Sequence, residues 1–596
     1  MGIMVVNMTK LKVMSDVGFA REKYDQLNEQ FVFESNVIAP AVVWTEYEDI
    51  QSLKEMVNNE LPLGIIIPIN DSNLTVGNDK AKVYEVIDLI YPSIIPIFKV
   101  EKMEVVEKLM TLINEKGFID YFVYSKDANV ILFSKEKNYY SRGVLEVSVK
   151  KKYDLKDFLA RYNRSNSQIL YVKDGRLLKD EVSYLQKRGV VVFTSANDDQ
   201  VSLYQTMISG VNGINVIGDY KNLYDIYKEV PENTIVRNSF SIAHRGFHKE
   251  YPENTIESGK EAIRHGAEII ELDVRLTKDY EVVVIHDSNT ANVSDTNVAV
   301  NSMWSKLSKV ELRNKFNEKI YIPKFHDYLK EFKDEDVVIF VEIKENSELL
   351  VEKTVEIIEE LDMASDVVII AFAKDSLLQT KKYNDSLSLG LLVGDKGNGT
   401  DLEETKRVVD YVLVTNSSYN PSHTALNYNL TNLLMARGIG AWPWTINGNN
   451  VYNEQLNGSM GITTDSSDVA GLLPINIERS IEIKKNVLVM NSIIYTRSMN
   501  NINNIVKYSI LNDSENILVS ENLETFRFEK KGKAFLIGSF EYEYPNGVKV
   551  NYLIDFIEVD NEVKWISYVL IGIGTTITIG LLIKLIINNK KRKGEK

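Results

Sequence analysis

The sequence predicts an α/β protein: two large α/β units, then a small β-rich module and a long apolar segment at the C-terminal side. Between residues 60 and 230, short apolar runs alternate with amphipathic stretches, which is typical of a layered β/α arrangement. From residue 241 onward, short apolar runs end in polar residues, as strands do at the C-terminal edge of a parallel sheet. At 596 residues, the chain is long enough for several domains.

The composition is that of a folded protein and narrows the classes of function. Charged residues make up 26% of the chain and apolar residues 44%. The formal net charge is −15 and no basic stripe is present, so nucleic acid is not an expected partner. There are no cysteines, which excludes disulfides, zinc thiolates and cysteine nucleophiles. An anionic substrate would have to be drawn to a local cationic site against an acidic surface.

Residues 1–235 are expected to form the first α/β unit, a barrel-like domain. Helices are expected between its strands, for example at Val100–Lys116 and Leu178–Arg188. No histidine precedes His244, so this unit has no pair of imidazoles for acid/base chemistry. The expected strands are Gly64–Pro68, Ile94–Phe98, Ile119–Tyr124, Val144–Val149, Gln168–Val172 and Val190–Thr194.

The second unit carries a pair of acids suited to a metal ion. Glu271 and Asp273 lie two residues apart in the apolar run Ile269–Val274, so both side chains should leave the same face of a strand. Two carboxylates held in this way suit a hard divalent cation such as Ca²⁺ or Mg²⁺. The alternative interpretation of such a pair is a solvated strand face or a partner for salt bridges.

Two histidines flank this acid pair in the sequence. His244 follows the apolar run Ser241–Ala243, and His286 follows Val282–Ile285, so both are placed at the ends of neighbouring strands. Imidazoles at such positions can act as acid and base near neutral pH, and Arg245 offers a planar fork for phosphate. The chain has only six histidines, which makes a chance placement of two here less plausible. The set predicts metal-assisted phosphodiester chemistry.

The order of these motifs resembles the glycerophosphodiester phosphodiesterases. The similarity covers about residues 238–475, a length that implies one (β/α)₈ TIM barrel. It implies hydrolysis of a glycerophosphodiester to glycerol 3-phosphate and an alcohol, with Ca²⁺ or Mg²⁺ as cofactor. The matching motifs are His244-Arg245-Gly246, Pro252–Thr255, Glu271–Val274, His286-Asp287, Val341–Lys344, Trp444–Asn447 and Gly461–Asp465.

The resemblance also implies a role for each candidate residue. The acid/base pair would be His244 and His286, in an order that the sequence does not assign. Trp444 would pack against the glycerol carbons, or else be a core tryptophan. A phospholipase-D-like cyclising lyase, or a non-catalytic binder of phosphate-rich envelope polymers, are the alternatives. The metal ligands would be Glu271, Asp273 and Glu342, and the phosphate contacts Arg245 and Lys344.

The first unit is similar to the second near its end, which predicts that it is a degenerate copy. Lys187–Phe193 parallels Ala436–Trp442, about 250 residues further on. Gly210–Val216 is similar to the last strand motif of the family without its terminal acid. Such a copy would either bind a polymer or headgroup without cutting it, or serve as a scaffold for the second unit.

Residues 476–563 are predicted to form a small β-rich stalk module without chemistry of its own. Asn546-Gly547 separates two apolar runs, which is a strong hairpin pattern. The boundaries expected for the whole chain are 1–235 for the degenerate barrel, 236–475 for the catalytic barrel, 476–563 for the stalk, 564–588 for a transmembrane helix and 589–596 for a basic tail.

The apolar segment 564–588 is predicted to span a membrane once. Its uncharged part, Trp565–Ile583, approaches the length that a helix needs to cross a bilayer, and basic residues follow it. The charge distribution places the basic tail in the cytoplasm and the globular part outside, although the first residues do not resemble a signal peptide. Gly572, Thr576 and Gly580 recur every four residues, which allows helix pairing in a homodimer.

Overall fold

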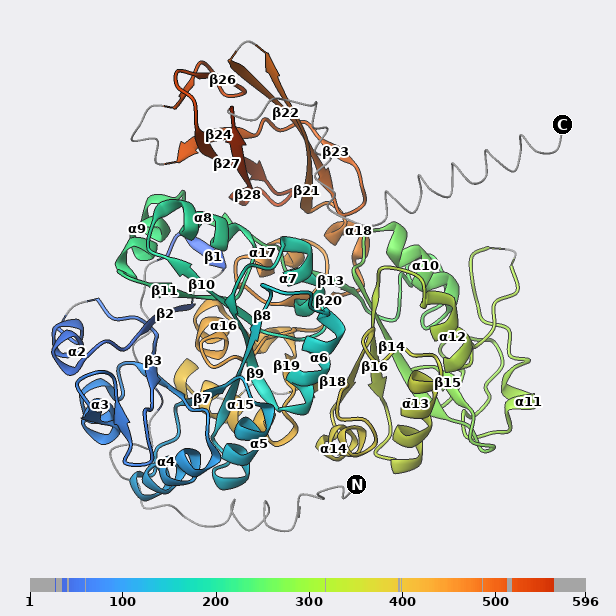
Figure 1. Cartoon of the computed structure of the whole chain (residues 1–596). Coiled ribbons are helices and arrows are strands. Elements are labelled where there is room, and N and C mark those ends of the chain that lie inside the picture. The colour runs from blue at the N-terminus through green and yellow to red at the C-terminus, as the bar shows by residue number, and fades with distance from the viewer. Residues whose placement is uncertain are drawn as a thin grey trace.

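The computed structural model describes residue 27 and residues 35–39, 42–58, 60–316, 318–394, 397, 399–484, 486–511 and 517–561 (Figure 1). Two barrels and a β-rich module make up this part of the chain.

The first unit is a closed barrel of eight parallel strands. Its expected strands are all present, with ends shifted by up to three residues, and two further strands complete the ring. The first and last strands pair in register, with Trp44 opposite Asn215, which closes the barrel. The strands, in chain order, are β2 (Val42–Glu46), β3 (Gly64–Pro68), β6 (Ile95–Lys99), β7 (Phe122–Ser125), β8 (Arg142–Ser148), β9 (Ser167–Asp174), β10 (Val192–Asn197) and β11 (Gly213–Ile217).

Amphipathic helices follow the strands of this barrel and cover its outside. In α4 (Met103–Lys116), Val106, Leu109 and Ile113 recur at helical spacing and are buried, and the helix ends at Gly117 in the left-handed conformation. A short hairpin of β4 (Thr75–Val76) and β5 (Ala81–Lys82) precedes α3. The other helices are α2 (Ile50–Met56), α3 (Val83–Ile90), α5 (Ala128–Lys137), α6 (Leu155–Arg164), α7 (Lys179–Gln186), α8 (Gln200–Ile208) and α9 (Lys221–Glu229).

The second unit is a parallel sheet that closes through an irregular stave. The segment 441–444 hydrogen-bonds to the strands on both sides: Trp442 N–H donates to Tyr419 O at 2.8 Å, and Met460 N–H donates to Ala441 O at 2.9 Å. The (β/α)₈ expectation for this unit is therefore confirmed. Its strands are β13 (Phe240–Ala243), β14 (Ile269–Leu276), β16 (Val338–Ile343), β17 (Val367–Ala371), β18 (Ser388–Val393), β19 (Ser418–Pro421) and β20 (Gly461–Thr464).

One strand that was expected in the parallel sheet of the second barrel has a different role. β15 (Val282–Val284) pairs antiparallel with β14, with Val284 opposite Val274, so it is a hairpin return and not a parallel neighbour. The physical reason is the short connection between β14 and β15, because a parallel crossover needs a dozen or more residues. The return still brings His286 back to the C-terminal half of β14, where Ile285 N–H donates to Asp273 O at 2.9 Å.

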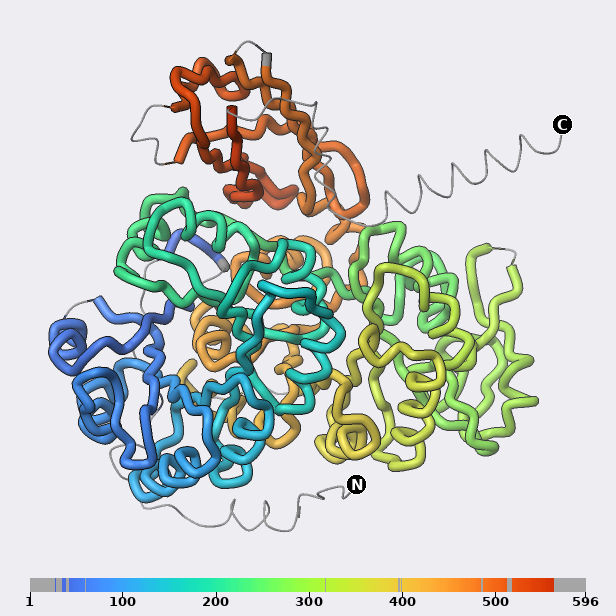
Figure 2. Tube along the Cα trace, in the orientation of Figure 1, coloured from blue at the N-terminus to red at the C-terminus, as the bar shows by residue number. Residues whose placement is uncertain are grey.

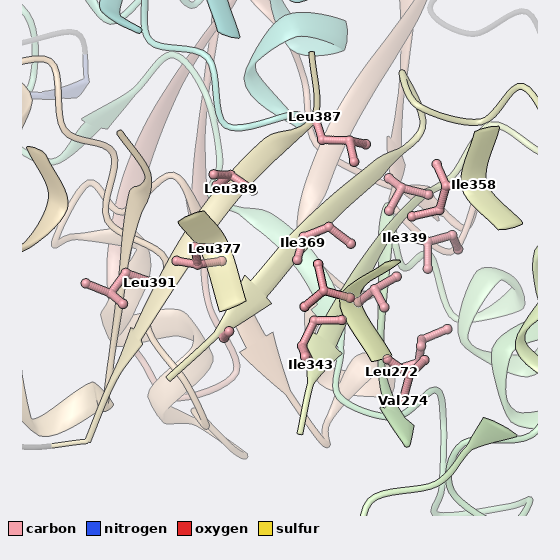
Figure 3. Packing of buried hydrophobic residues seen from close by; sticks show 14 of the residues in the cluster. Leu272, Val274, Ile339, Ile343, Ile358, Ile369, Leu377, Leu387, Leu389 and Leu391 are labelled. Carbon is pink, nitrogen blue, oxygen red and sulfur yellow. The ribbon is translucent and has the colours of Figure 1, made fainter. Parts of the chain in front are cut away.

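Alternation along the strands separates the core from the site. In β14, Leu272 and Val274 pack outward against helices, together with Ile339, Ile343 and other residues of the neighbouring strands (Figure 3). Glu271 and Asp273 leave the opposite face, into the barrel. The helices that cover this barrel are α10 (Ile256–Arg264), α11 (Trp304–Leu307), α12 (Phe325–Phe332), α13 (Glu348–Glu360), α14 (Lys374–Tyr383), α15 (Asp401–Thr415), α16 (Tyr428–Met435), α17 (Asn450–Gln455) and α18 (Ser467–Ala470), with a 3₁₀ turn at His423–Ala425.

The two barrels meet at their N-terminal ends. Residues just before the strands of one barrel bond to residues just before the strands of the other: Asn163 Nδ2 donates to Ser386 O at 2.7 Å, and Arg188 lies 2.7 Å from Asp366. At the centre, the buried Asp120 lies 2.6 Å from Arg142 of its own barrel and 2.7 Å from Arg437 of the other. Both C-terminal mouths therefore point away from this interface.

The β-rich module contacts both barrels (Figure 2). The predicted hairpin at Asn546-Gly547 joins β27 (Lys533–Glu543) and β28 (Lys549–Asp560). Two short strands from earlier in the chain, β1 (Val37–Ala39) and β12 (Thr234–Ile235), extend the sheet beside β28. The strands of the module are β21 (Pro474–Lys484), β22 (Val487–Thr496), β23 (Asn501–Ile502), β24 (Lys507–Leu511), β25 (Leu518–Ser520), β26 (Thr525–Phe528), β27 (Lys533–Glu543) and β28 (Lys549–Asp560).

The prediction of a single-pass membrane protein is corrected. In the part of the chain that the structure describes, no helix has the length and the apolar character needed to cross a bilayer. The segment 564–588 on which the prediction was based, the basic tail 589–596 and the Gly572/Thr576/Gly580 pairing pattern all lie outside the described residues. The prediction of a membrane helix rests on hydropathy alone.

Candidate active site

Three carboxylates converge at the C-terminal mouth of the second barrel. Glu271 and Asp273 come from β14, and Glu342 comes from β16, where it stands directly opposite Asp273. One oxygen of each lies within 4.8 Å of the others, and the three side chains are almost fully buried. The sequence predicted these three residues as metal ligands, and the structure brings them together.

The carboxylates repel one another inside this buried space. Burial, Asp273 and Glu342 raise the pKa of Glu271 well above its usual range. Burial and Asp273 raise the pKa of Glu342 to about 7. Burial also raises the pKa of Asp273, but Lys344 and Arg245 outweigh it and lower that pKa. A cation bound among the three carboxyl groups would neutralise their mutual repulsion and stabilise all three as anions.

The donor set fits a hard divalent cation. All three residues offer oxygen atoms, the ligands that Ca²⁺ and Mg²⁺ prefer. Asp273 Oδ1 is buried and has no hydrogen-bond partner. The closest basic group is Lys344, whose Nζ lies 2.7 Å from Glu342 Oε1 and 3.5 Å from Asp273 Oδ1. Lys344 therefore stands beside the cluster, as a residue that contacts phosphate next to a metal would.

The loop after β13 wraps around the acids. Arg245 has a left-handed backbone, with φ of +56°, which turns its N–H toward Glu271 Oε2 at 3.0 Å. Its guanidinium lies 3.1 Å from Glu253 and 3.4 Å from Asp273. Arg245 thus contacts the carboxylate cluster through both its backbone and its side chain.

Asn254 fixes the orientation of Asp273. Its Nδ2 donates to Asp273 Oδ2 at 2.9 Å, and its Oδ1 accepts from the Asp273 N–H at 3.1 Å. Asn254 has a φ of +62° and is buried. The sequence placed it within a family motif but assigned it no role, because the clamp depends on a backbone conformation that no spacing reveals.

His244 is held by a carboxylate from the last strand region. Its Nδ1 lies 2.6 Å from Asp465 Oδ1, and Asn447 Nδ2 donates to Asp465 Oδ2 at 2.7 Å. Burial raises the pKa of Asp465, but His244 and Asn447 outweigh burial and lower it to about 2. An ionised carboxylate can only accept, so His244 carries its proton on Nδ1 and leaves Nε2 available for substrate.

His286 is held in the same way by its own neighbour. Nδ1 lies 2.8 Å from Asp287 Oδ1, and Asn292 Nδ2 donates to Asp287 Oδ2 at 2.5 Å. Burial raises the pKa of Asp287, but hydrogen bonds from His286 and Asn292 outweigh it and lower that pKa. Both histidines are between one fifth and one third exposed, so each can reach a bound substrate.

Trp444 lies at the rim formed by β19 and the irregular stave. Its indole N–H donates to Asn420 O at 2.8 Å, and its ring meets the exposed Phe372 edge-on at 5.6 Å between centroids. The pair makes an apolar wall of the kind that glycerol carbons could contact. Phe372, Asp465 and Asn447 were given no role from the sequence, since their contacts join segments far apart in the chain.

Comparison with known proteins decides the family. The model of the glycerophosphoryl diester phosphodiesterase family matches residues 244–469. A glycerophosphodiester phosphodiesterase of Caldanaerobacter subterraneus subsp. tengcongensis is 31% identical over 235 residues, which are 38% of this chain and 94% of that protein. The chain belongs to the glycerophosphoryl diester phosphodiesterase family. The predicted family and enzyme class are thereby confirmed.

Further proteins of this kind match a similar share of the chain. A protein of Bacillus subtilis named as a putative glycerophosphodiester phosphodiesterase is 25% identical over 236 residues, covering 38% of this chain and 95% of its own. Among solved structures, the glycerophosphodiester phosphodiesterase of Thermotoga maritima is 26% identical, with a TM-score of 0.32, and the match covers 39% of this chain and 96% of that one. The family match lies within the second barrel.

Proposed function

We propose that the second barrel hydrolyses glycerophosphodiesters to glycerol 3-phosphate and an alcohol, with a divalent cation as cofactor. The observation that carries this proposal is the convergence of Glu271, Asp273 and Glu342 within 4.8 Å. Next to this cluster stand two histidines, each with a carboxylate at Nδ1. A site for binding alone would not need this second feature.

The three carboxylates would hold the cation, either Ca²⁺ or Mg²⁺. When bound, the cation supplies Lewis-acid polarisation and neutralises charge on the phosphodiester. Lys344 and Arg245 add fixed positive charge at the same mouth, where negative charge develops as the phosphorus is attacked. Trp444 and Phe372 would contact the glycerol carbons.

The two histidines would move the protons. One Nε2 accepts the proton of the attacking hydroxyl, which belongs to water or to the free hydroxyl of the glycerol. The other histidine, present as the imidazolium, donates its Nε2 proton to the departing alkoxide. Where the glycerol hydroxyl attacks, water then opens the cyclic phosphate that forms and releases glycerol 3-phosphate. Asp465 and Asp287 hold the two rings in the tautomer that this exchange requires and stabilise each imidazolium as it forms.

The two barrels differ in the residues at their C-terminal mouths, which supports different roles for them. We propose a catalytic domain at 236–475, a degenerate barrel at 1–235 and a β-rich module at 476–563. Ile66, Pro68 and Lys99 stand in the first barrel at the strand positions that Glu271, Asp273 and Glu342 have in the second. Phosphodiester chemistry of this type is therefore assigned to the second barrel.

The test is turnover of glycerophosphocholine by the whole chain with Mg²⁺ or Ca²⁺, followed by phosphorus NMR. The expected product is glycerol 3-phosphate, released by the wild type and abolished by chelation with EDTA. Cyclic phosphate as the final product would replace hydrolysis by a lyase reaction. No turnover of glycerophosphocholine or of other glycerophosphodiesters, with either metal, would contradict the proposal.

A further inference from the structure

The mouth of the first barrel is lined by charged and polar side chains. Along each strand, alternate residues face the interior, and the apolar inner layer of Trp44, Ile97 and Phe193 is followed two residues later by a polar layer. None of the second barrel's three carboxylates has an acidic counterpart at the same strand position in the first barrel. The polar layer consists of Glu46, Lys99, Tyr124, Glu146, Tyr171, Lys173, Ser195 and Asn215.

The strand register identifies the residues of the first barrel that stand at the positions of the second barrel's carboxylates. Pro68 stands opposite Lys99 in the first barrel, just as Asp273 stands opposite Glu342 in the second. Each pair lies four residues beyond an equivalent pair, Gly64 with Ile95 and Ile269 with Val338. A lysine thus occupies the place of a carboxylate ligand. The first barrel's mouth therefore presents lysines beside Glu46 and Glu146, where the second barrel's mouth presents three carboxylates.

The polar layer is connected rather than scattered. Lys99 Nζ lies 3.4 Å from Glu146 Oε2, and the Tyr124 hydroxyl donates to the same carboxylate. On the other side, Asn215 Nδ2 donates to the Tyr171 hydroxyl at 3.0 Å and to Glu46 at 3.4 Å. These bonds fix the side chains before any ligand arrives, which lowers the cost of binding.

Two groups in this network remain available to a ligand. In the described part of the chain, no carboxylate lies within 4 Å of the Lys173 ammonium. Its side chain interacts with that of Lys99, while Glu146 and Glu46 act on it from further away. The Asn215 side chain is fully buried, yet its Oδ1 has no hydrogen-bond partner. A buried acceptor left without a donor costs free energy, which a ligand hydroxyl would recover.

A second cation strengthens the case for an anion. Burial lowers the pKa of Lys99, and repulsion from the neighbouring Lys173 lowers it further, whereas Glu146, 3.4 Å from the Lys99 ammonium, raises it. A ligand with negative charge would relieve this repulsion, in the same way that a cation would relieve the three acids of the second barrel.

We propose that the first barrel binds a small hydroxylated anion, of the polyol phosphate class, at this mouth. The phosphate would lie at Lys173 and Lys99, and a hydroxyl of the polyol would donate to Asn215 Oδ1. The site holds its ligand without cutting it, because it has neither histidines nor the carboxylate triad. The two mouths face away from each other, so this site acts separately from the catalytic one.

The experiment measures binding of sn-glycerol 3-phosphate to the whole chain by isothermal titration calorimetry in EDTA. Chelation removes any contribution of a metal ion at the second barrel but should leave the first mouth intact. We expect one binding site per chain. Lys173→Met should weaken binding at least tenfold, whereas Lys173→Arg should retain most of it. Lys126→Met, at a lysine that is 68% exposed and paired with Glu101, is the matched control.

Further arms separate this proposal from the proposed hydrolysis. His286→Ala should leave binding in EDTA unchanged while it removes turnover. The binding proposal and the hydrolysis proposal can therefore be contradicted independently of each other. Titration with inorganic phosphate, which lacks the polyol, and with glycerate, which lacks the phosphate, shows whether both groups are required for binding. Absence of binding in EDTA, or equal binding by Lys173→Met and the wild type when both melt at the same temperature, would overturn the proposal.

Discussion

Asp465 Oδ1 lies 2.6 Å from Nδ1 of His244, although 221 residues separate the two in the chain. The strand pairing of β13 with β20 creates this contact, because Ala243 and Thr464 stand opposite each other just before the two residues. The catalytic mouth therefore depends on barrel closure between its first and last strands.

Asp465→Asn should lower turnover by about 10²-fold or more, since the amide can present its donor to Nδ1 and favour the wrong tautomer. The fold should persist, because Asn447 retains one partner at this position. The measurement is kcat with glycerophosphocholine at saturating metal. A variant with wild-type kcat would show that Asp465 does not position His244.

The same pair predicts a pH dependence of stability. The pKa of Asp465 is about 2 in the folded protein, against 3.8 for an unperturbed aspartate. A depressed pKa means that the unfolded chain takes up the proton first, so this contribution to the free energy of unfolding is present above about pH 4 and is lost as the pH falls toward 2. The melting-temperature difference between wild type and Asp465→Asn should shrink across this window. A constant difference would contradict the ion pair.

His286→Ala and His244→Ala should each reduce turnover by about 10²- to 10⁴-fold, as expected for loss of a general acid or base. Thermal unfolding should change little, because both side chains are partly exposed. His326→Ala, at a histidine on α12 that is 34% exposed and pairs with Asp327, is the matched control and should retain full activity. Full activity in either site variant would refute the acid/base assignment.

Glu342→Gln should raise the metal concentration needed for half-maximal activity by about tenfold or more, since removing one charged ligand weakens a hard-cation site. In the wild type, the metal stabilises the fold by about 2.7 kcal/mol at a hundred times its Kd, and this gain should be smaller in the variant. Differential scanning calorimetry with and without Mg²⁺ measures it. Glu281→Gln, at a glutamate 41% exposed, is the control, and equal metal responses in both variants would count against Glu342 as a ligand.

Asp120→Asn should destabilise the protein by about 3 kcal/mol or more, because it leaves Arg142 and Arg437 buried and without their charge partner. Urea unfolding followed by tryptophan fluorescence reports the change. Asp385→Asn removes an exposed ion pair with Arg164 at the same interface and should cost less than about 1 kcal/mol. Similar losses in the two variants would show that the buried triad does not hold the barrels together.

Much of the catalytic site was predictable from the sequence because its residues lie on strands. Period-two alternation puts Glu271 and Asp273 on one face, and the motif order places Glu342 on the next stave. Asn254 and Asp465 lay beyond that reasoning, since one acts through a left-handed backbone and the other through a contact across the closed barrel. Antiparallel pairing of β15 was missed because an apolar run alone does not reveal its direction.

The arrangement of the domains was harder to predict from the sequence. The alternation of apolar and amphipathic segments indicated a first barrel, but the packing of both barrels through their N-terminal ends rests on pairs such as Arg188 with Asp366, which no local pattern encodes. Strands β1 and β12 are only two or three residues long. β1 pairs with β12, and β12 pairs with β28, which lies more than 300 residues further along the chain. Pairing over such separations follows from the packed structure and not from local propensity.

The most direct test of the metal site is anomalous diffraction from crystals of the whole chain soaked in Mn²⁺. We predict one strong peak bonded to oxygens of Glu271, Asp273 and Glu342, and its loss in Glu342→Gln crystals. A second group of potential ligands, Glu250, Glu261 and His265, lies elsewhere on the same barrel and provides an internal comparison. Occupancy there with no peak at the three buried carboxylates would contradict the account.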